Sequence, residues 1–212
     1  TADGTIAIGH SALTALTSGA SNTAIGYETL KATTSSAGST ALGYQAGTAS
    51  TGAANVYIGS QAGLAAVAAE GNVVIGANAG SSMGDIDANI LIGREAGQYL
   101  KHTNTTKNVA IGKQALRGAN ADSTAPTNSV AIGYQALTAI TTGSANVALG
   151  MSSLLDNTTG GDNVSIGNYS SAENITGGSN IAIGTNALNY NESGAFNTAI
   201  GRMAMQGASG QS

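Results

Sequence analysis

The chain contains no cysteine and no tryptophan, and Phe196 and Pro126 are its only phenylalanine and its only proline. Without cysteine it has neither a disulfide framework nor a thiolate metal site. Charged residues make up only 8% of the sequence and the net charge is −4. This excludes a general nucleic-acid binder, which needs an excess of lysine and arginine to neutralise phosphates. No apolar run has the length of a membrane span, so we expect no membrane insertion.

Glycine is abundant, and one phrase recurs from Asn22-Thr23-Ala24-Ile25-Gly26 to Asn197-Thr198-Ala199-Ile200-Gly201. Eight of the eleven gaps between its closing glycines are seventeen residues long. A fixed short period of this kind predicts stacked coils. We therefore expect residues 1–212 to form a single all-β, parallel β-solenoid of about twelve coils, as a segment of a longer chain. The closing glycines are Gly9, Gly26, Gly43, Gly59, Gly76, Gly93, Gly112, Gly133, Gly150, Gly167, Gly184 and Gly201.

The three residues before each closing glycine predict a short strand. Side chains alternate between the two faces of a strand, so the first and third residues share one face and the second has the other. The first and third are mostly Ile, Val or Leu, and we expect them to face the core of the coil. The second is mostly alanine, which predicts close approach of another backbone, either a second sheet of the same coil or a neighbouring subunit, and the subunit is favoured. This expected packing face comprises Ala24, Ala41, Tyr57, Val74, Leu91, Ala110, Ala131, Ala148, Ala182 and Ala199.

The remainder of each repeat predicts a second short extended run and two corners. Asparagine precedes the strand in nine copies, which suits a repeated turn and a stacked amide ladder. Thr142-Gly143, Thr159-Gly160, Thr176-Gly177 and Ser193-Gly194 indicate a glycine-rich corner at which a positive φ is expected.

The phrase Asn-Thr/Val-Ala-Ile-Gly, followed by x-x-Ala-Leu and a Thr-Gly corner, resembles two kinds of repeat. One is found in the head domains of trimeric autotransporter adhesins, and the other in phage tail fibres matured by a self-cleaving chaperone. The resemblance implies a left-handed coil, three chains on one axis, and an extracellular structural role in host attachment. It places the protein on a virion or on a bacterial cell surface, and it leaves a tail fibre and an adhesin head both open.

The residues indicate no catalytic site, no cofactor and no metal site, so we expect no enzyme. His10 and His102 are several repeats apart, and Glu28, Glu95, Glu173 and Glu192 lie in different repeats. Asp85 and Asp87 suggest a calcium ion, but only one coil carries them, so a solvated loop is favoured. Two further classes stay open: a monomeric solenoid that binds ice or polysaccharide, and a polysaccharide-degrading tail spike.

Residues 94–128 interrupt the regular spacing of the repeats. They include parts of the two longer gaps between closing glycines and five of the seven basic residues. Insertions in solenoids map to loops on one face, often the binding face. A cell-surface glycan with anionic groups, or another receptor, is therefore the candidate partner beside the chain itself, although a solvated bulge is favoured for this region. The candidate ligand-binding residues are Arg94, Tyr99, Lys101, His102, Lys107, Lys113 and Arg117. Tyr27, Tyr44, Tyr134 and Tyr169 offer a sugar-stacking surface, although corner packing is favoured for them.

Overall fold

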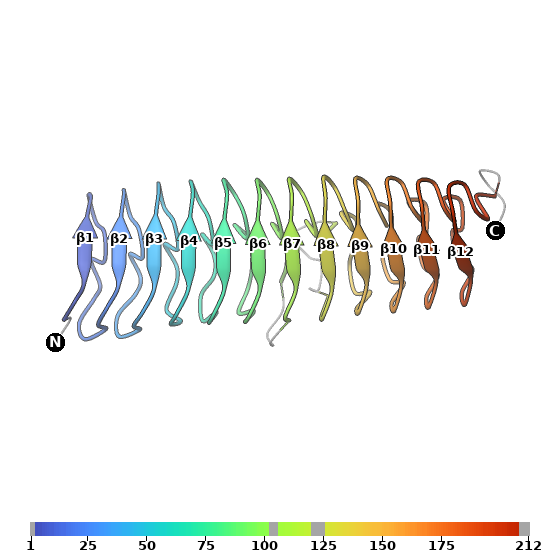
Figure 1. Cartoon of the computed structure of the whole chain (residues 1–212). Coiled ribbons are helices and arrows are strands. Elements are labelled where there is room, and N and C mark those ends of the chain that lie inside the picture. Colours follow the sequence, from blue (N-terminus) through green and yellow to red (C-terminus); the bar gives the residue numbers. More distant parts are fainter. Residues whose placement is uncertain (1–2, 102–105, 120–125, 208–212) are drawn as a thin grey trace.

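A computed structural model describes residues 3–101, 106–119 and 126–207. Twelve strands of three residues, one in each coil, form one parallel sheet in sequence order. The coils stack along one axis, with the two chain ends at opposite ends of the stack (Figure 1). The parallel β-solenoid is therefore confirmed. The strands are β1 Ile6–Ile8, β2 Thr23–Ile25, β3 Thr40–Leu42, β4 Val56–Ile58, β5 Val73–Ile75, β6 Ile90–Ile92, β7 Val109–Ile111, β8 Val130–Ile132, β9 Val147–Leu149, β10 Val164–Ile166, β11 Ile181–Ile183 and β12 Thr198–Ile200.

The strand register follows the repeated phrase without a slip. Ala24 pairs with Ala41, and Ala41 pairs with Tyr57 across the one sixteen-residue gap. The longer gaps on either side of Gly112 leave the register equally intact, because Leu91 pairs with Ala110 and Ala110 pairs with Ala131. The longer gaps of the 94–128 region therefore do not shift the register of β6, β7 and β8.

The asparagine column forms the expected amide ladder inside the coils. The backbone N–H of Asn72 donates to Asn55 Oδ1 at 3.0 Å, and the N–H of Asn89 donates to Asn72 Oδ1 at 2.9 Å. Asn72 Nδ2 donates to the carbonyl of Ile86, 2.8 Å away in the following corner. Each amide thus ties one coil to the next while satisfying backbone groups that are buried from water. Ser39 and Ser129 continue the ladder by accepting from the N–H groups of Asn55 and Asn146 at 3.2 Å.

The middle residue of every strand from β2 onward points into the coil, and we call this set the inner column. Its members are at most 2% exposed in the single chain. The prediction that they face a partner is therefore wrong. The coil is narrow, so a small residue suits its interior, where another part of the same chain covers it. The inner column includes the residues that were expected to form the packing face: Ala24, Ala41, Tyr57, Val74, Leu91, Ala110, Ala131, Ala148, Ala182 and Ala199.

The size of the inner-column residue is matched by the residue four places after each closing glycine. Five of the seven alanines in the inner column occur with leucine at that place, as in Ala131 with Leu137, and both of these are buried. In the two coils with the largest inner residues, the partners are Gly63 for Tyr57 and Gly97 for Leu91. A Cβ on Gly97 would lie 2.7 Å from Leu91 Cδ2, and one on Gly63 would collide with the Tyr57 ring. The inner-column residue and the residue four places after the closing glycine therefore share one close-packed interior.

Tyr57 provides a test of this matched packing. Its ring fills the space left by Gly47 and Gly63, and burial raises the pKa of its hydroxyl to about 12. We expect Tyr57→Ala to lower the free energy of unfolding by about 3–5 kcal/mol, because it opens a cavity. Adding Gly63→Leu should recover part of this loss, since leucine adopts the same positive φ at Leu30 and Leu137. Urea denaturation of both variants measures the effect. No recovery in the double variant would contradict the shared interior.

The second half of each coil differs from the predicted extended run. Its described residues form turns and bends and no second strand, and the residues two and four places after the closing glycine have positive φ, for example 53° at Glu28 and 47° at Leu30. Gly143 and its equivalents do not have the positive φ that was expected. They are required for another reason: a Cβ on Gly143 would collide with the carbonyl oxygen of Gly160 in the next coil. The close approach of successive coils therefore favours glycine at this corner in these coils, whereas Ser36, Ala69 and Ile86 hold the same place in others.

Candidate functional site

The first and third residues of the strands point out of the coil, and together they form what we call the outer face. Of its twenty-four positions, twenty-one hold Ile, Val or Leu, and the others are Thr23, Thr40 and Thr198. None of these side chains is fully buried in the single chain. The prediction that they face the coil's own core is wrong, because the inner column occupies that side of each strand. Eight aliphatic side chains on this face are more than a third exposed: Ile6, Ile8, Leu42, Ile90, Ile111, Leu149, Ile181 and Ile200.

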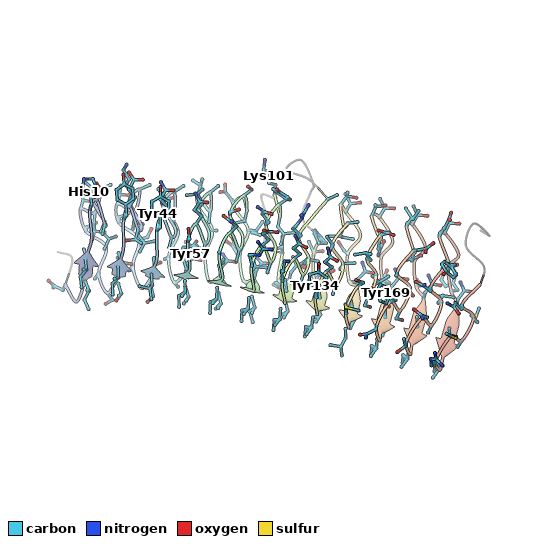
Figure 2. All side chains as sticks on the ribbon, turned by 90° about the horizontal axis from the view of Figure 1, so that it is seen from above. His10, Tyr44, Tyr57, Lys101, Tyr134 and Tyr169 are labelled. Carbon is cyan, nitrogen blue, oxygen red and sulfur yellow. The ribbon has the colours of Figure 1, made fainter. Side chains whose placement is uncertain are left out.

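The outer face is regular as well as apolar. Each column follows the axis at the spacing of paired strands, about 4.8 Å per coil. Figure 2 shows the side chains of the strands projecting from one side of the stack along its whole length. Soluble monomers rarely expose a continuous apolar patch of this extent, and such patches mark sites of association. The outer face is therefore the strongest candidate interface of the described chain.

A second feature lies at the corner directly after each closing glycine, and we call these residues the corner column. The rings of His10 and Tyr27 stack at 5.3 Å, and those of Tyr27 and Tyr44 at 5.4 Å, with interplanar angles of 11° and 10°. In Figure 2, His10 and Tyr44 lie away from the side on which the strands project their side chains. The tyrosines at this end of the chain thus pack on one another, as expected for corner packing.

Side-chain ladders run beside the corner column. Gln45 Nε2 donates to Glu28 Oε2 at 2.9 Å, and Gln61 Nε2 donates to Gln45 Oε1 at 3.3 Å. The same order recurs farther along, where Gln114 donates to Glu95 at 2.7 Å and Gln135 donates to Gln114 at 3.1 Å. A carboxylate begins each ladder because it can only accept hydrogen bonds when it is ionised. These ladders tie successive coils together at their corners.

Glu28 gives the first ladder a predictable pH dependence. Lys31 Nζ, 2.6 Å from Oε1, and then Gln45 lower the pKa of the Glu28 carboxyl below its ordinary value. A lowered folded-state pKa contributes stability above the unfolded-state pKa, and this contribution is lost as the pH falls through the folded-state value. We expect wild type to melt slightly above Glu28→Gln at pH 6, and the difference to shrink as the pH falls below 4.5, the ordinary pKa of a glutamate. Calorimetry over this pH range measures it; a difference that does not change with pH would contradict the assignment.

The structure separates the seven residues that were predicted to bind a ligand. Arg94 and Lys113 follow one another in the corner column, whereas Tyr99 and Arg117 lie farther round the coil. Lys107 stands two residues before β7, and Lys101 lies about half a coil beyond the closing glycine Gly93. His102 lies outside the described residues. The described members of this group therefore occupy different places in their coils, and their role in ligand binding stays a prediction.

Two cation–π pairs nevertheless form within this group. Lys113 Nζ lies 5.4 Å from the centroid of the Tyr134 ring, and the Arg117 guanidinium lies 5.4 Å from that of Tyr99. Each pair joins neighbouring coils, since Lys113 accepts a backbone bond from Gln135 and Arg117 accepts one from Tyr99. Contacts of this kind contribute about 0.5–1 kcal/mol at exposed sites. Both cations therefore help to hold the coils together.

Asp85 and Asp87 use their carboxylates within the chain. Asp85 Oδ1 accepts from the N–H of Ala68 at 3.1 Å, and Asp87 Oδ1 accepts from the N–H of Glu70 at 2.7 Å. These bonds link the loop to the preceding coil and account for both aspartates as turn residues. Among the described residues, no group of three or more His, Cys, Asp or Glu side chains could hold a metal ion.

The carboxylates at the corners are widely spaced. Glu28 and Glu95 occupy the same place in coils that are four steps apart, so about 19 Å separates them along the axis. Paired carboxylates that cleave glycosides lie about 5–9.5 Å apart. These two glutamates therefore cannot act together on one bond within a single chain.

Comparison with models of protein families, with curated proteins and with solved structures gave no match. The fold itself defines the class of this protein as a β-solenoid repeat protein. In the part of the chain that the structure describes, no helix is long and apolar enough to cross a membrane.

Proposed function

We propose that this chain is a segment of a homotrimeric attachment fibre on the surface of a virion, with the outer faces of three chains packed around a common axis. The observation that carries the proposal is the continuous aliphatic surface left exposed on the single chain. Burial of apolar area stabilises by about 25 cal/mol per Å², so removing this surface from water would drive association. The number three and the attachment role follow from the resemblance of the repeats to those of phage tail fibres and trimeric adhesins.

The regular register supports this assembly. All twelve strands have the same length, their third residue is Ile or Leu in every coil, and the register has no slip. Three identical faces can therefore meet coil by coil along the axis, as closed cyclic symmetry requires. A trimer would present each weak contact with a cell-surface glycan three times, which raises the overall avidity without any new contact. A bacterial surface adhesin would use the same assembly, and the identity of the flanking segments would separate these two origins.

Binding to intact bacteria tests the attachment role. Fluorescently labelled protein should adhere to the cells of a susceptible strain, and soluble surface polysaccharide from that strain should displace it. Adhesion to no strain in a broad bacterial panel would contradict the attachment role. Incubation of the protein with the same polysaccharides would test for a degrading tail spike, because shortened chains would show cleavage.

The regularity of the outer face also favours a second candidate, a monomeric solenoid that binds a periodic surface such as ice or crystalline polysaccharide. This class requires the outer face to stay exposed in solution. A monomeric mass together with thermal hysteresis or adsorption to cellulose would support it. The surface threonines do not support this class, because the hydroxyls of Thr17, Thr51 and Thr158 donate to backbone carbonyls of the next coil.

A further inference from the structure

The corner column changes abruptly after Tyr44. Tyr27 is stacked between His10 and Tyr44, so both faces of its ring are covered. The next two residues of the column are Ser60 and Ala77, which are small and exposed. Tyr44 therefore stacks on Tyr27 with one ring face and has no aromatic neighbour on the other, and it is 50% exposed.

We call the stretch of the corner column from Tyr44 over Ser60 and Ala77 the step, and a cation lies at its far end. The column continues with Arg94, whose side chain is 54% exposed and lies 3.6 Å from Glu95 Oε1. The backbone bonds from Gln61 to Tyr44, from Asn78 to Ser60 and from Glu95 to Ala77 keep these corners in register. Tyr44 and Arg94 are thus three coil steps apart, about 14 Å along the axis. The small side chains of Ser60 and Ala77 leave the space above them open.

The chemistry along the step is mixed. The face of an aromatic ring carries negative charge density and attracts the polarised C–H groups of a sugar ring. Gln61 uses one amide hydrogen in its ladder, and a primary amide has two, so one donor is left for a hydroxyl. The guanidinium of Arg94 has five N–H donors, and a single contact with Glu95 leaves others for a carboxylate. Lys113 follows Arg94 in the column and adds positive charge.

We propose that the corner from Tyr44 to Arg94 binds a short acidic oligosaccharide. One sugar ring stacks on the free face of Tyr44, the chain runs along the axis over Ser60 and Ala77, and an acidic group pairs with Arg94. This inference rests on the proposed attachment function and assigns it a site and a ligand class. The site lies off the outer face, so association of three chains and binding of the glycan are compatible.

Calorimetric titration of the full chain with a panel of oligosaccharides of two to four residues tests the site. The panel pairs uronate-containing and sialate-containing sugars with neutral counterparts of equal length. The decisive variant is Ser60→Tyr, which keeps Tyr44 and Arg94 but covers the free face of Tyr44 and shortens the distance from the last ring to Arg94 by one coil. We expect wild type to prefer the acidic sugars, Ser60→Tyr to lose about tenfold in affinity, and Arg94→Gln to lose the preference for acidic sugars.

Two matched controls accompany these variants. Tyr169→Ala removes an exposed tyrosine, and Arg202→Gln removes a cation from the last coil of the same column; neither should change the affinity. Binding of no acidic sugar, or equal affinity of wild type and Ser60→Tyr, would overturn the site. If Ser60→Tyr binds as wild type while a trimer forms and cells are bound, only this site fails. If neither a trimer nor cell binding is found, the proposed function itself fails.

Discussion

Replacing Ala131 with arginine should abolish the fold of the surrounding coils. Ala131 is fully buried in the inner column, between Ala110 and Ala148 in the neighbouring strands, and Leu137 fills the space opposite. An arginine there has neither room nor a partner for its charge. A buried unpaired charge costs about 3–5 kcal/mol or more, and overpacking adds to this cost. The total is comparable to the whole stability of many domains. Circular dichroism and thermal melting should show an unfolded or strongly destabilised chain.

Met151→Arg is the matched control for this prediction. It places the same side chain in the corner column, which already holds Arg94, Lys113 and Arg202, so its melting temperature should stay near that of wild type. A folded Ala131→Arg chain that has lost only its oligomeric state would contradict the inner position of this residue. That result would support the opposite orientation of the strands, with alanine toward a partner.

Substituting two residues of the outer face should have the converse effect, a folded chain that no longer associates. Ile111 and Leu149 are 36% and 42% exposed in the single chain, so lysine is tolerated there by the coil itself. In a trimer the same positions would place like charges from three chains near one axis. Removing charges from water without partners costs several kcal/mol per site. We expect the Ile111→Lys, Leu149→Lys double variant to be monomeric at micromolar concentration with an intact β spectrum.

A matched double variant controls for the loss of apolar surface. Val67 and Ile175 have a similar exposure, 48% and 40%, but lie outside the strands, in the same place in their coils as Lys101. Val67→Lys with Ile175→Lys should therefore keep the mass of wild type. Equal oligomeric states in the two double variants would contradict a role of the outer face.

The period of the closing glycines was enough to predict the coils, the strand positions and the parallel sheet. The orientation of the strands could not be obtained in this way. Alternation separates the two faces of a strand, but both faces here are apolar, so hydrophobicity alone does not say which is inside. The informative signal was size. Tyr57 with Gly63 and Leu91 with Gly97, against Ala131 with Leu137, shows that the middle residue shares an interior with the later position.

The candidate sites show a similar division. Clustering in sequence suggested one basic patch, yet a coil turns through all of its sides within seventeen residues. Arg94 and Lys101 are therefore close in sequence, but Arg94 follows the strand directly and Lys101 lies about half a coil farther on. Residues one coil apart are the true neighbours, as His10, Tyr27 and Tyr44 demonstrate. Tyr44 and Arg94 are distant in sequence, and their proximity becomes apparent only when equivalent residues of successive coils are aligned.

The molar mass in solution tests the central claim most directly. Sedimentation equilibrium of the wild-type chain should give three times the 20.5 kDa mass of the single chain. This mass should persist on dilution to micromolar concentration, because burial of the outer face along the whole stack predicts a stable assembly. A mass of 20.5 kDa, with the aliphatic columns exposed and the fold intact, would contradict the account.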